Sequence, residues 1–127
     1  MQKCNLRNCV LVVLGIFFLA ACTSKTIEPP VIIPPSKVYS FNQDVLPLFT
    51  QNCATTGCHV AGNIPPDLSA ANAYNSLFAD NLVDTLSPQQ SGIYLAVKPG
   101  GSMNSHLPNS TDQITILYWI QQGAKNN

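Results

Sequence analysis

Two cysteines and a histidine near the middle of the chain, Cys53, Cys58 and His59, constrain the fold more than any other feature of the sequence. Four residues separate the two cysteines, and the histidine follows the second cysteine directly. A bond that uses both thiols closes a short loop, and the rest of a small domain has to pack around that loop. Gly57, next to Cys58, supplies the permissive backbone that such a loop needs if it has to bulge.

Three interpretations of this motif remain open from its chemistry alone. Two cysteines followed by a histidine attach a c-type haem, although the usual spacing between the cysteines is two residues. The thiols add to the two vinyl groups, and the adjacent imidazole ligates the iron. A second interpretation is a local disulfide between Cys53 and Cys58 in an oxidising compartment, with His59 an ordinary surface residue. A zinc site is the third, but the paired ligand spacings typical of zinc are missing.

The first 21 residues are typical of a secretory signal. Lys3 and Arg7 precede an apolar run, from Cys9 to Ala21, that is too short to span a bilayer comfortably. A transmembrane anchor is the alternative. We therefore expect residues 1–21 to be removed, and Cys4 and Cys9 to leave with them.

The end of this run, Leu19-Ala20-Ala21-Cys22, resembles the lipobox of bacterial lipoproteins at all four positions. The resemblance implies cleavage before Cys22, lipid on that cysteine and stable anchoring by several acyl chains. We expect a lipid-anchored protein of the cell envelope that faces the periplasm. Thr23 stands where the inner-membrane retention signal has aspartate, which slightly favours the outer membrane.

Residues 22–39 are predicted to be a linker that follows the lipidated cysteine. Four prolines in two pairs, Pro29-Pro30 and Pro34-Pro35, favour an extended chain over a packed helix. Only Cys53 and Cys58 of the five cysteines then remain for the folded domain. That domain is mildly acidic and has no basic patch, so nucleic acid binding is not expected.

Four short helices joined by loops are predicted in the domain, residues 40–127, without strands or an internal repeat. Their expected ranges are 44–51, 69–79, 87–97 and 110–122. Asp44 is expected to cap the first helix, which places Pro47 in the first turn, and Ser69 to cap the second. The capping boxes 87–90 and 110–113 mark the starts of the last two helices. An all-α domain of this size has a thin core, which a buried haem would fill.

Apolar residues recur at helical spacing and define the expected core faces. They are Val45, Leu48 and Phe49 in the first helix, Tyr74, Leu77 and Phe78 in the second, and Ile114, Leu117, Ile120 and Ala124 around the last. Trp119 falls outside the last of these faces, and the sequence does not indicate what it packs against.

Residues 40–127 resemble a small monohaem c-type cytochrome, closest to the haem domains of Bacteroidetes lipoproteins. The resemblance rests on Asp44–Phe49 leading into Cys53, on the Cys-x4-Cys-His variant, on Pro66-Asp67-Leu68 and on the ending Tyr118–Ala124. It implies a bundle of about four helices around one covalent haem c. It also implies that the Pro66 carbonyl accepts the Nδ1 proton of His59, and that Leu68 packs on haem.

The same resemblance implies that His59 and Met103 are the axial iron ligands, with Met103 in the loop before the last helix. Asn104 follows Met103 where the family often has proline, and His106 is the other histidine within reach. We therefore expect a membrane-anchored carrier of single electrons, not an enzyme, whose partners are redox proteins. The alternative is a haem-free lipoprotein interaction module with a Cys53–Cys58 disulfide.

Overall fold

The structure is a computed structural model that describes residues 36–127. It contains no strand in this range, and its elements are η2 (Phe41–Val45), α2 (Leu46–Asn52), α3 (Ala73–Ala79), η3 (Pro88–Gln90), α4 (Gly92–Val97) and α5 (Ser110–Gln121). The predicted all-α class is therefore confirmed for the described residues, with four α-helices. The signal segment, Cys22 and the proline pairs lie outside them. Within the described part, no helix is long and apolar enough to cross a membrane.

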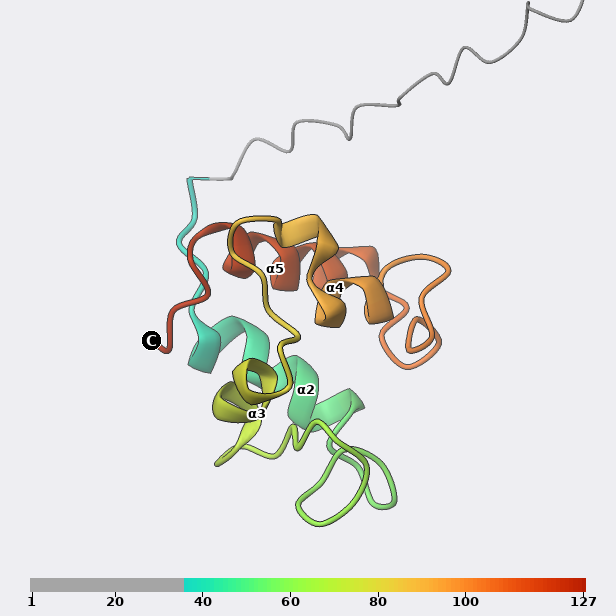
Figure 1. Cartoon of the computed structure of the whole chain (residues 1–127). Helices are drawn as coiled ribbons and strands as arrows, with labels where there is room; N and C mark the ends of the chain where they lie inside the picture. The colour runs from blue at the N-terminus through green and yellow to red at the C-terminus, as the bar shows by residue number, and fades with distance from the viewer. Residues whose placement is uncertain (1–35) are drawn as a thin grey trace, which may run out of the picture. The chain divides into compact units, whose positions relative to one another are not determined.

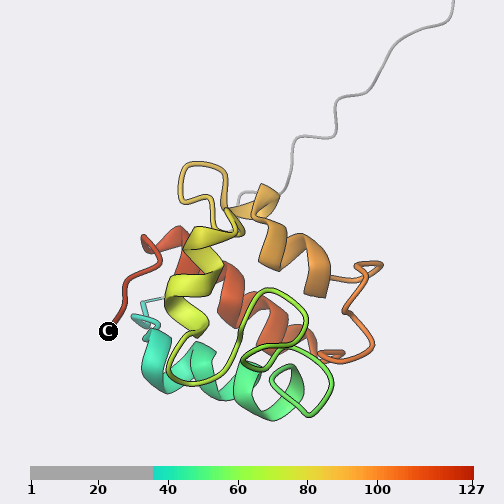
Figure 2. The same cartoon turned by 60° about the horizontal axis from the view of Figure 1, so that its bottom comes forward.

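Helix α5 is the centre of the domain (Figures 1 and 2). It contacts η2, η3 and α4. Its buried residues are Gln113, Ile116, Leu117, Trp119 and Ile120, so they occupy more than one face of the helix. The predicted face is correct for Leu117, Ile120 and Ala124 but wrong for Ile114, which is 40% exposed while Ile116 is buried.

The first helix begins earlier than predicted, and Ser40 rather than Asp44 is its N-cap. The Ser40 Oγ accepts a hydrogen bond from the backbone N–H of Gln43 (3.2 Å), and the π-helical turn η2 leads into α2. The Asp44 carboxylate instead accepts from the Ser40 N–H (2.8 Å) and from Nζ of Lys37 (2.6 Å). Pro47 is tolerated because it lies in the first turn of α2.

The C-terminal segment satisfies the first free amide groups of η2, which have no partner within a helix. The side-chain oxygen of Asn127 accepts from the N–H of Phe41 (3.0 Å), and its backbone oxygen accepts from the N–H of Asn42 (2.9 Å). The two ends of the domain, far apart in sequence, therefore lie side by side (Figure 1).

The two middle helices are shorter than predicted. Helix α3 begins only at Ala73, after a turn in which the Ser69 carbonyl accepts from the amides of Asn72 and Ala73, and its N-cap is Asn72 rather than Ser69. The predicted helix 87–97 is broken at Ser91, whose ψ is 129°. The buried Ser91 hydroxyl accepts from the N–H of Asp84 (2.8 Å) and donates to its carbonyl (3.1 Å). This side-chain pairing competes with helical geometry and separates η3 from α4.

The C-terminal ends of the last two helices, and the start of α5, agree with the sequence to within one residue. Helix α4 stops at Lys98, which is extended (ψ 167°) because Pro99 follows it. Helix α5 is capped by Asn109 rather than Ser110, since the Asn109 side chain accepts from the N–H of Thr111 (2.9 Å). It ends before Gly123, whose φ of +94° suits a C′ residue.

Candidate functional site

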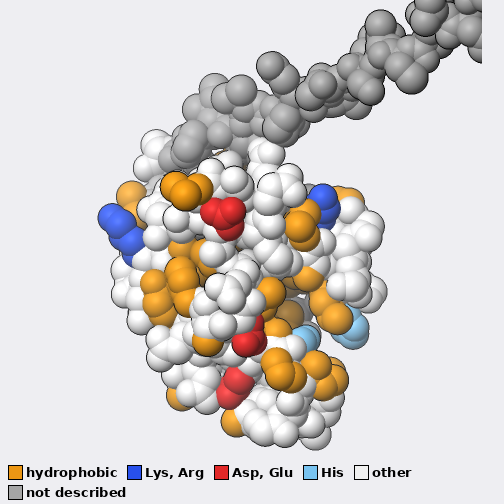
Figure 3. All heavy atoms as spheres, in the orientation of Figure 1, with side chains coloured by type: hydrophobic (Ala, Val, Ile, Leu, Met, Phe, Trp, Pro, Cys, Tyr) orange, Lys and Arg blue, Asp and Glu red, His pale blue; other side chains and the backbone are white. Residues whose placement is uncertain are grey.

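A cavity of about 360 Å³ lies between the loop after α2 and the segment that contains α4 and the loop after it. Its volume falls in the range of small-molecule and cofactor pockets. Among the described residues, no lysine, arginine, aspartate or glutamate lines this cavity. The residues of its wall are Asn52, Cys53, Cys58, His59, Ile64, Pro65, Pro66, Leu68, Leu82, Gly92, Ile93, Ala96, Val97, Ser102, Met103 and His106. Figure 3 shows the hollow with hydrophobic and histidine side chains around it.

The two cysteines stand on one wall of the cavity. Cys53 is buried at the C-cap of α2, where its N–H donates to the Phe49 carbonyl (2.8 Å). Cys58 is half-buried, and its N–H donates to the Thr55 carbonyl (2.9 Å). Gly57 has a φ of +83°, so the loop between the cysteines does use the backbone freedom expected of it.

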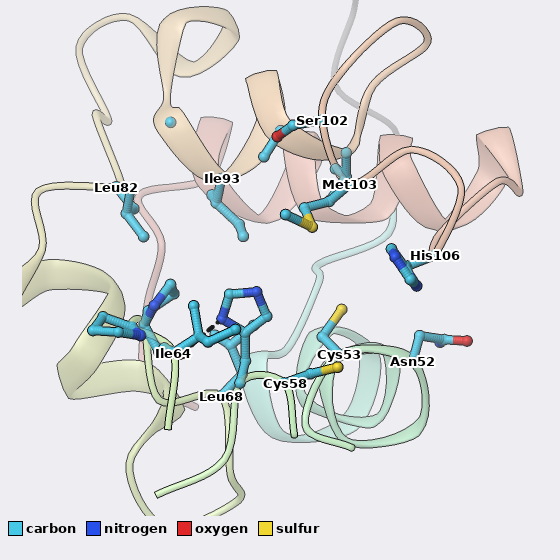
Figure 4. A pocket seen from close by; sticks show the side chains of 16 residues that line it. Asn52, Cys53, Cys58, Ile64, Leu68, Leu82, Ile93, Ser102, Met103 and His106 are labelled. Atoms are coloured by element: carbon cyan, nitrogen blue, oxygen red, sulfur yellow. Dashed lines mark hydrogen bonds between the residues drawn. The ribbon is translucent and has the colours of Figure 1, made fainter. Parts of the chain in front are cut away.

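Both thiols are free and point into the cavity (Figure 4). No disulfide joins Cys53 to Cys58 in the structure. Burial, and to a smaller extent the neighbouring Cys58, raises the pKa of the Cys53 thiol above its ordinary value. Cys53 is therefore a neutral thiol at neutral pH, on the apolar side of the cavity.

The hydrogen bonds of His59 determine which of its ring nitrogens is available. Its Nδ1 lies 3.1 Å from the carbonyl oxygen of Pro66 and 3.1 Å from that of Ile64. Carbonyl oxygens only accept, so Nδ1 must carry a proton, and in the neutral imidazole Nε2 then has the free lone pair. A lone pair at Nε2, with Nδ1–H bonded to a carbonyl, is the state in which histidine ligates a metal.

The segment that supplies the Pro66 carbonyl is fixed to the histidine by its backbone as well. Leu68 donates its N–H to the carbonyl of His59 (2.8 Å), and its side chain is buried in the core at 2% exposure. His59 in turn donates its N–H to the Cys53 carbonyl (3.2 Å). The loop from Cys53 to Leu68 thus presents two thiols, one imidazole and one leucine to the same cavity.

Met103 and His106 approach the cavity from the loop between α4 and α5. Met103 points into it across from the two cysteines, and His106 lies at its edge (Figure 4). The N–H of Met103 donates to the Ala96 carbonyl (2.8 Å), and the N–H of His106 donates to the Met103 carbonyl (3.0 Å). Met103 is 37% exposed, and His106 is exposed as well.

The two glycines before Met103, Gly100 and Gly101, shape the start of the loop that carries it. Gly100 has a φ of +80°, which a residue with a side chain rarely adopts. A Cβ on Gly101 would collide with the backbone carbonyls of Leu95 and Ala96. Gly101 therefore lies close against the end of α4, and this contact anchors the loop that carries Met103.

The structure brings all six expected cofactor residues of the domain to one cavity. They are Cys53, Cys58, His59, Pro66, Leu68 and Met103. The expected contact between His59 Nδ1 and the Pro66 carbonyl is present. Cys22 lies outside the described residues.

Several wall residues were not identified from the sequence, notably Leu82, Ile93, Ala96 and the Ile64 carbonyl. The apolar run from Ile93 to Val97 was the one available signal for them. Within residues 36–127, no three His, Cys, Asp or Glu side chains cluster closely enough to hold a metal ion among themselves. Comparison of the chain with models of protein families, with curated proteins and with solved structures finds no match.

Proposed function

We propose that the domain is a monohaem c-type cytochrome that carries single electrons. The observation that carries this proposal is the convergence of two free thiols, a histidine with Nδ1 bonded to carbonyls, and a methionine on one apolar cavity. Cys53 and Cys58 would form the two thioether bonds. His59 would be the proximal ligand and Met103 the distal ligand.

The residues that line the cavity are suited to hold a haem. The two carbonyl contacts of Nδ1 favour the neutral tautomer of His59 that has its proton on Nδ1, and this tautomer offers the Nε2 lone pair that an iron ligand needs. The Met103 thioether stands across the cavity from the cysteines, so the two axial donors come from different walls (Figure 4). The apolar wall, which includes Leu68 and Ile93, is suited to a large apolar macrocycle.

A haem held in this way supplies one-electron redox chemistry. The chain's own residues would set the reduction potential of this haem. As an iron ligand, the thioether of Met103 would favour the reduced iron and so a higher potential. Because both His59 and Met103 would ligate the iron, no coordination position would be left open for substrate, and we propose a carrier rather than an enzyme.

The location and partners of this carrier are proposals from the sequence. Cys22 would carry the lipid, and residues 22–39 would hold the domain away from the membrane on its periplasmic side. The partners would be other redox proteins. The outer membrane is slightly favoured over the inner membrane, on the ground of Thr23 alone.

Expression in a host with a c-type maturation system tests the proposal. The purified chain is denatured, separated on a gel and stained for haem. We expect the stain to stay with the wild-type band and to be lost from the double variant Cys53→Ser, Cys58→Ser. Ser102→Ala, which changes a wall residue without a proposed bond, is the matched control and should keep the stain. Wild-type protein that releases its haem on denaturation would contradict covalent attachment, and wild-type protein that binds no haem and holds a Cys53–Cys58 disulfide would support the haem-free module instead.

A further inference from the structure

The orientation of the Pro66 carbonyl depends on a hydroxyl group in another helix. The N–H of Asp67 donates to Oγ of Ser76 on α3 (2.8 Å). The carbonyl of Pro66 belongs to the same peptide group as this N–H, and that peptide bond is trans. A trans peptide group is planar, so its C=O and N–H point in opposite directions. One plane therefore has His59 Nδ1 at one end and Ser76 Oγ at the other.

We infer that Ser76 is a positioning residue, which aims the Pro66 carbonyl at His59 through the Pro66–Asp67 peptide plane. A rotation of this plane that broke the bond at one end would break the bond at the other. Hydrogen bonds in such a chain also polarise one another, so the bond to Ser76 strengthens the carbonyl as an acceptor. The hydroxyl thus acts on the imidazole without touching it.

The flanking contacts of Asp67 hold the same segment against α3. Its carboxylate accepts from the N–H of Ser69 (2.9 Å) and from the side-chain amide of Asn72 (2.7 Å). These bonds hold the side chain of residue 67 and do not involve the peptide plane before it. That plane is bonded at its N–H end by Ser76 and at its carbonyl end by His59.

His59 has a second acceptor, the Ile64 carbonyl, at the same distance of 3.1 Å. Ile64 is 55% exposed, whereas the bond to Pro66 is partly buried. A hydrogen bond is stronger where water is excluded, so the Pro66 carbonyl is the more effective partner. Loss of Ser76 should therefore weaken the bonding of Nδ1–H without abolishing it.

This inference rests on the proposed function only for its redox consequence. A weaker bond at Nδ1–H makes the imidazole a poorer donor, which stabilises the oxidised iron less. The reduction potential of the haem-loaded protein should then shift to a more positive value in Ser76→Ala. A role of Ser76 in folding alone would leave the potential unchanged.

The test compares Ser76→Ala with wild type, with Ser76→Thr as the conservative rescue and with Asn75→Ala as the control. Asn75 is an exposed neighbour on the same helix. In the full chain, with or without haem, the proton on His59 Nδ1 is followed by nuclear magnetic resonance. We expect its exchange with water to quicken roughly five- to tenfold in Ser76→Ala, as loss of one hydrogen bond implies. We expect Ser76→Thr to stay within about twofold of wild type, as a retained hydroxyl requires.

In the haem-free chain, the ¹⁵N shifts of His59 should report Nδ1–H in wild type and a mixture of tautomers in Ser76→Ala. His106 provides an internal reference in the same spectrum. If wild type binds no covalent haem, the proposed function fails, and the tautomer measurement still decides the role of Ser76. If wild type binds haem but the potential, exchange rate and tautomer of Ser76→Ala match those of Asn75→Ala, this inference alone is overturned. Should Ser76→Ala fail to fold, Ser76→Thr and Ser76→Val provide the same comparison at nearly equal shape.

Discussion

The indole ring of Trp119 packs against the phenyl ring of Phe41, with ring centroids 5.2 Å apart. Both side chains are almost fully buried, at 1% and 2% exposure. Tyr74 lies against the same indole, 6.3 Å between centroids, and the indole N–H donates to the Lys125 carbonyl (2.9 Å). This aromatic cluster joins α5 to η2 and α3, and none of its three rings lines the cavity.

Trp119→Ala should destabilise the domain by about 3–5 kcal/mol, because it removes a large buried ring and its contacts. Denaturant unfolding of wild type and variant in the same loading state measures the difference. Ile114→Ala, on the exposed side of the same helix, is the control and should cost less than about 1 kcal/mol. Equal losses for the two variants would show that the cluster is not the main contact of α5.

The pair formed by Lys37 and Asp44 should make the stability of the domain depend on pH at both ends of the scale. The Lys37 ammonium, and then the Ser40 N–H, lower the pKa of Asp44 below its ordinary 3.8. The bond to Asp44 raises the pKa of Lys37 above 10.5. Because the pKa of Asp44 is lowered in the folded state, its carboxylate stabilises the fold at pH values above 3.8. This stabilisation is lost as the pH falls through the pKa that Asp44 has in the folded protein. Because the pKa of Lys37 is raised in the folded state, its ammonium group stabilises the fold at pH values below 10.5. This stabilisation is lost as the pH rises through the pKa that Lys37 has in the folded protein.

Unfolding of Asp44→Asn at several pH values tests this dependence. The variant should be less stable than wild type near neutral pH, and the difference should shrink as the pH falls below 3.8 and through the lowered pKa of Asp44, where wild-type Asp44 itself becomes protonated. Asp80→Asn, at an exposed carboxylate, is the control. A difference for Asp44→Asn that stays constant down to the lowest pH would contradict the ion pair as its cause.

Gly101→Ala should displace the loop that carries Met103. The added Cβ would collide with the carbonyls of Leu95 and Ala96, and overpacking of this kind costs about 1–3 kcal/mol. In haem-loaded protein the spectrum should also change, because Met103 moves with the loop. Ser102→Ala, at the next residue, should alter neither stability nor spectrum by a comparable amount. An unchanged spectrum in Gly101→Ala would mean that this loop does not position the distal ligand.

Met103 and His106 both reach the cavity, and single variants should separate their roles. In haem-loaded protein, Met103→Ala should remove the weak red-edge absorption band of thioether ligation and lower the potential. It should also open the reduced iron to carbon monoxide. His106→Ala should do none of these. If His106→Ala binds carbon monoxide and Met103→Ala keeps its spectrum, the distal ligand is the histidine.

Local signals in the sequence predicted much of the fold. The Ser110–Gln113 region and Gly123 place the ends of α5 to within about one residue, because capping chemistry acts over a few residues. The break at Ser91 was not predictable, since it depends on a bond to Asp84, seven residues earlier. The cap at Ser40 was missed for a similar reason, because Asn127 completes the start of that helix.

In the candidate site, too, local patterns were predictable from the sequence and contacts between distant residues were not. Cys53, Cys58 and His59 were identifiable because their spacing is a local pattern. Pro66, Leu68 and Met103 were named only through the resemblance to a family, and the structure brings them to the same cavity. The contribution of Ser76 could not be anticipated, because it needs a helix to place a hydroxyl against a peptide group nine residues away.

Mass spectrometry of the denatured protein tests covalent haem attachment most directly. The protein is produced in a host with a c-type maturation system, denatured and treated with a thiol-alkylating reagent. It is then cleaved by a protease, and the mass of the peptide that contains Cys53 and Cys58 is measured. We predict that its mass is increased by one haem and that neither cysteine is alkylated. Replacement of either cysteine by serine should leave at most one thioether bond. A peptide without haem from fully matured wild-type protein, with its thiols alkylated or joined to each other, would contradict the proposed function.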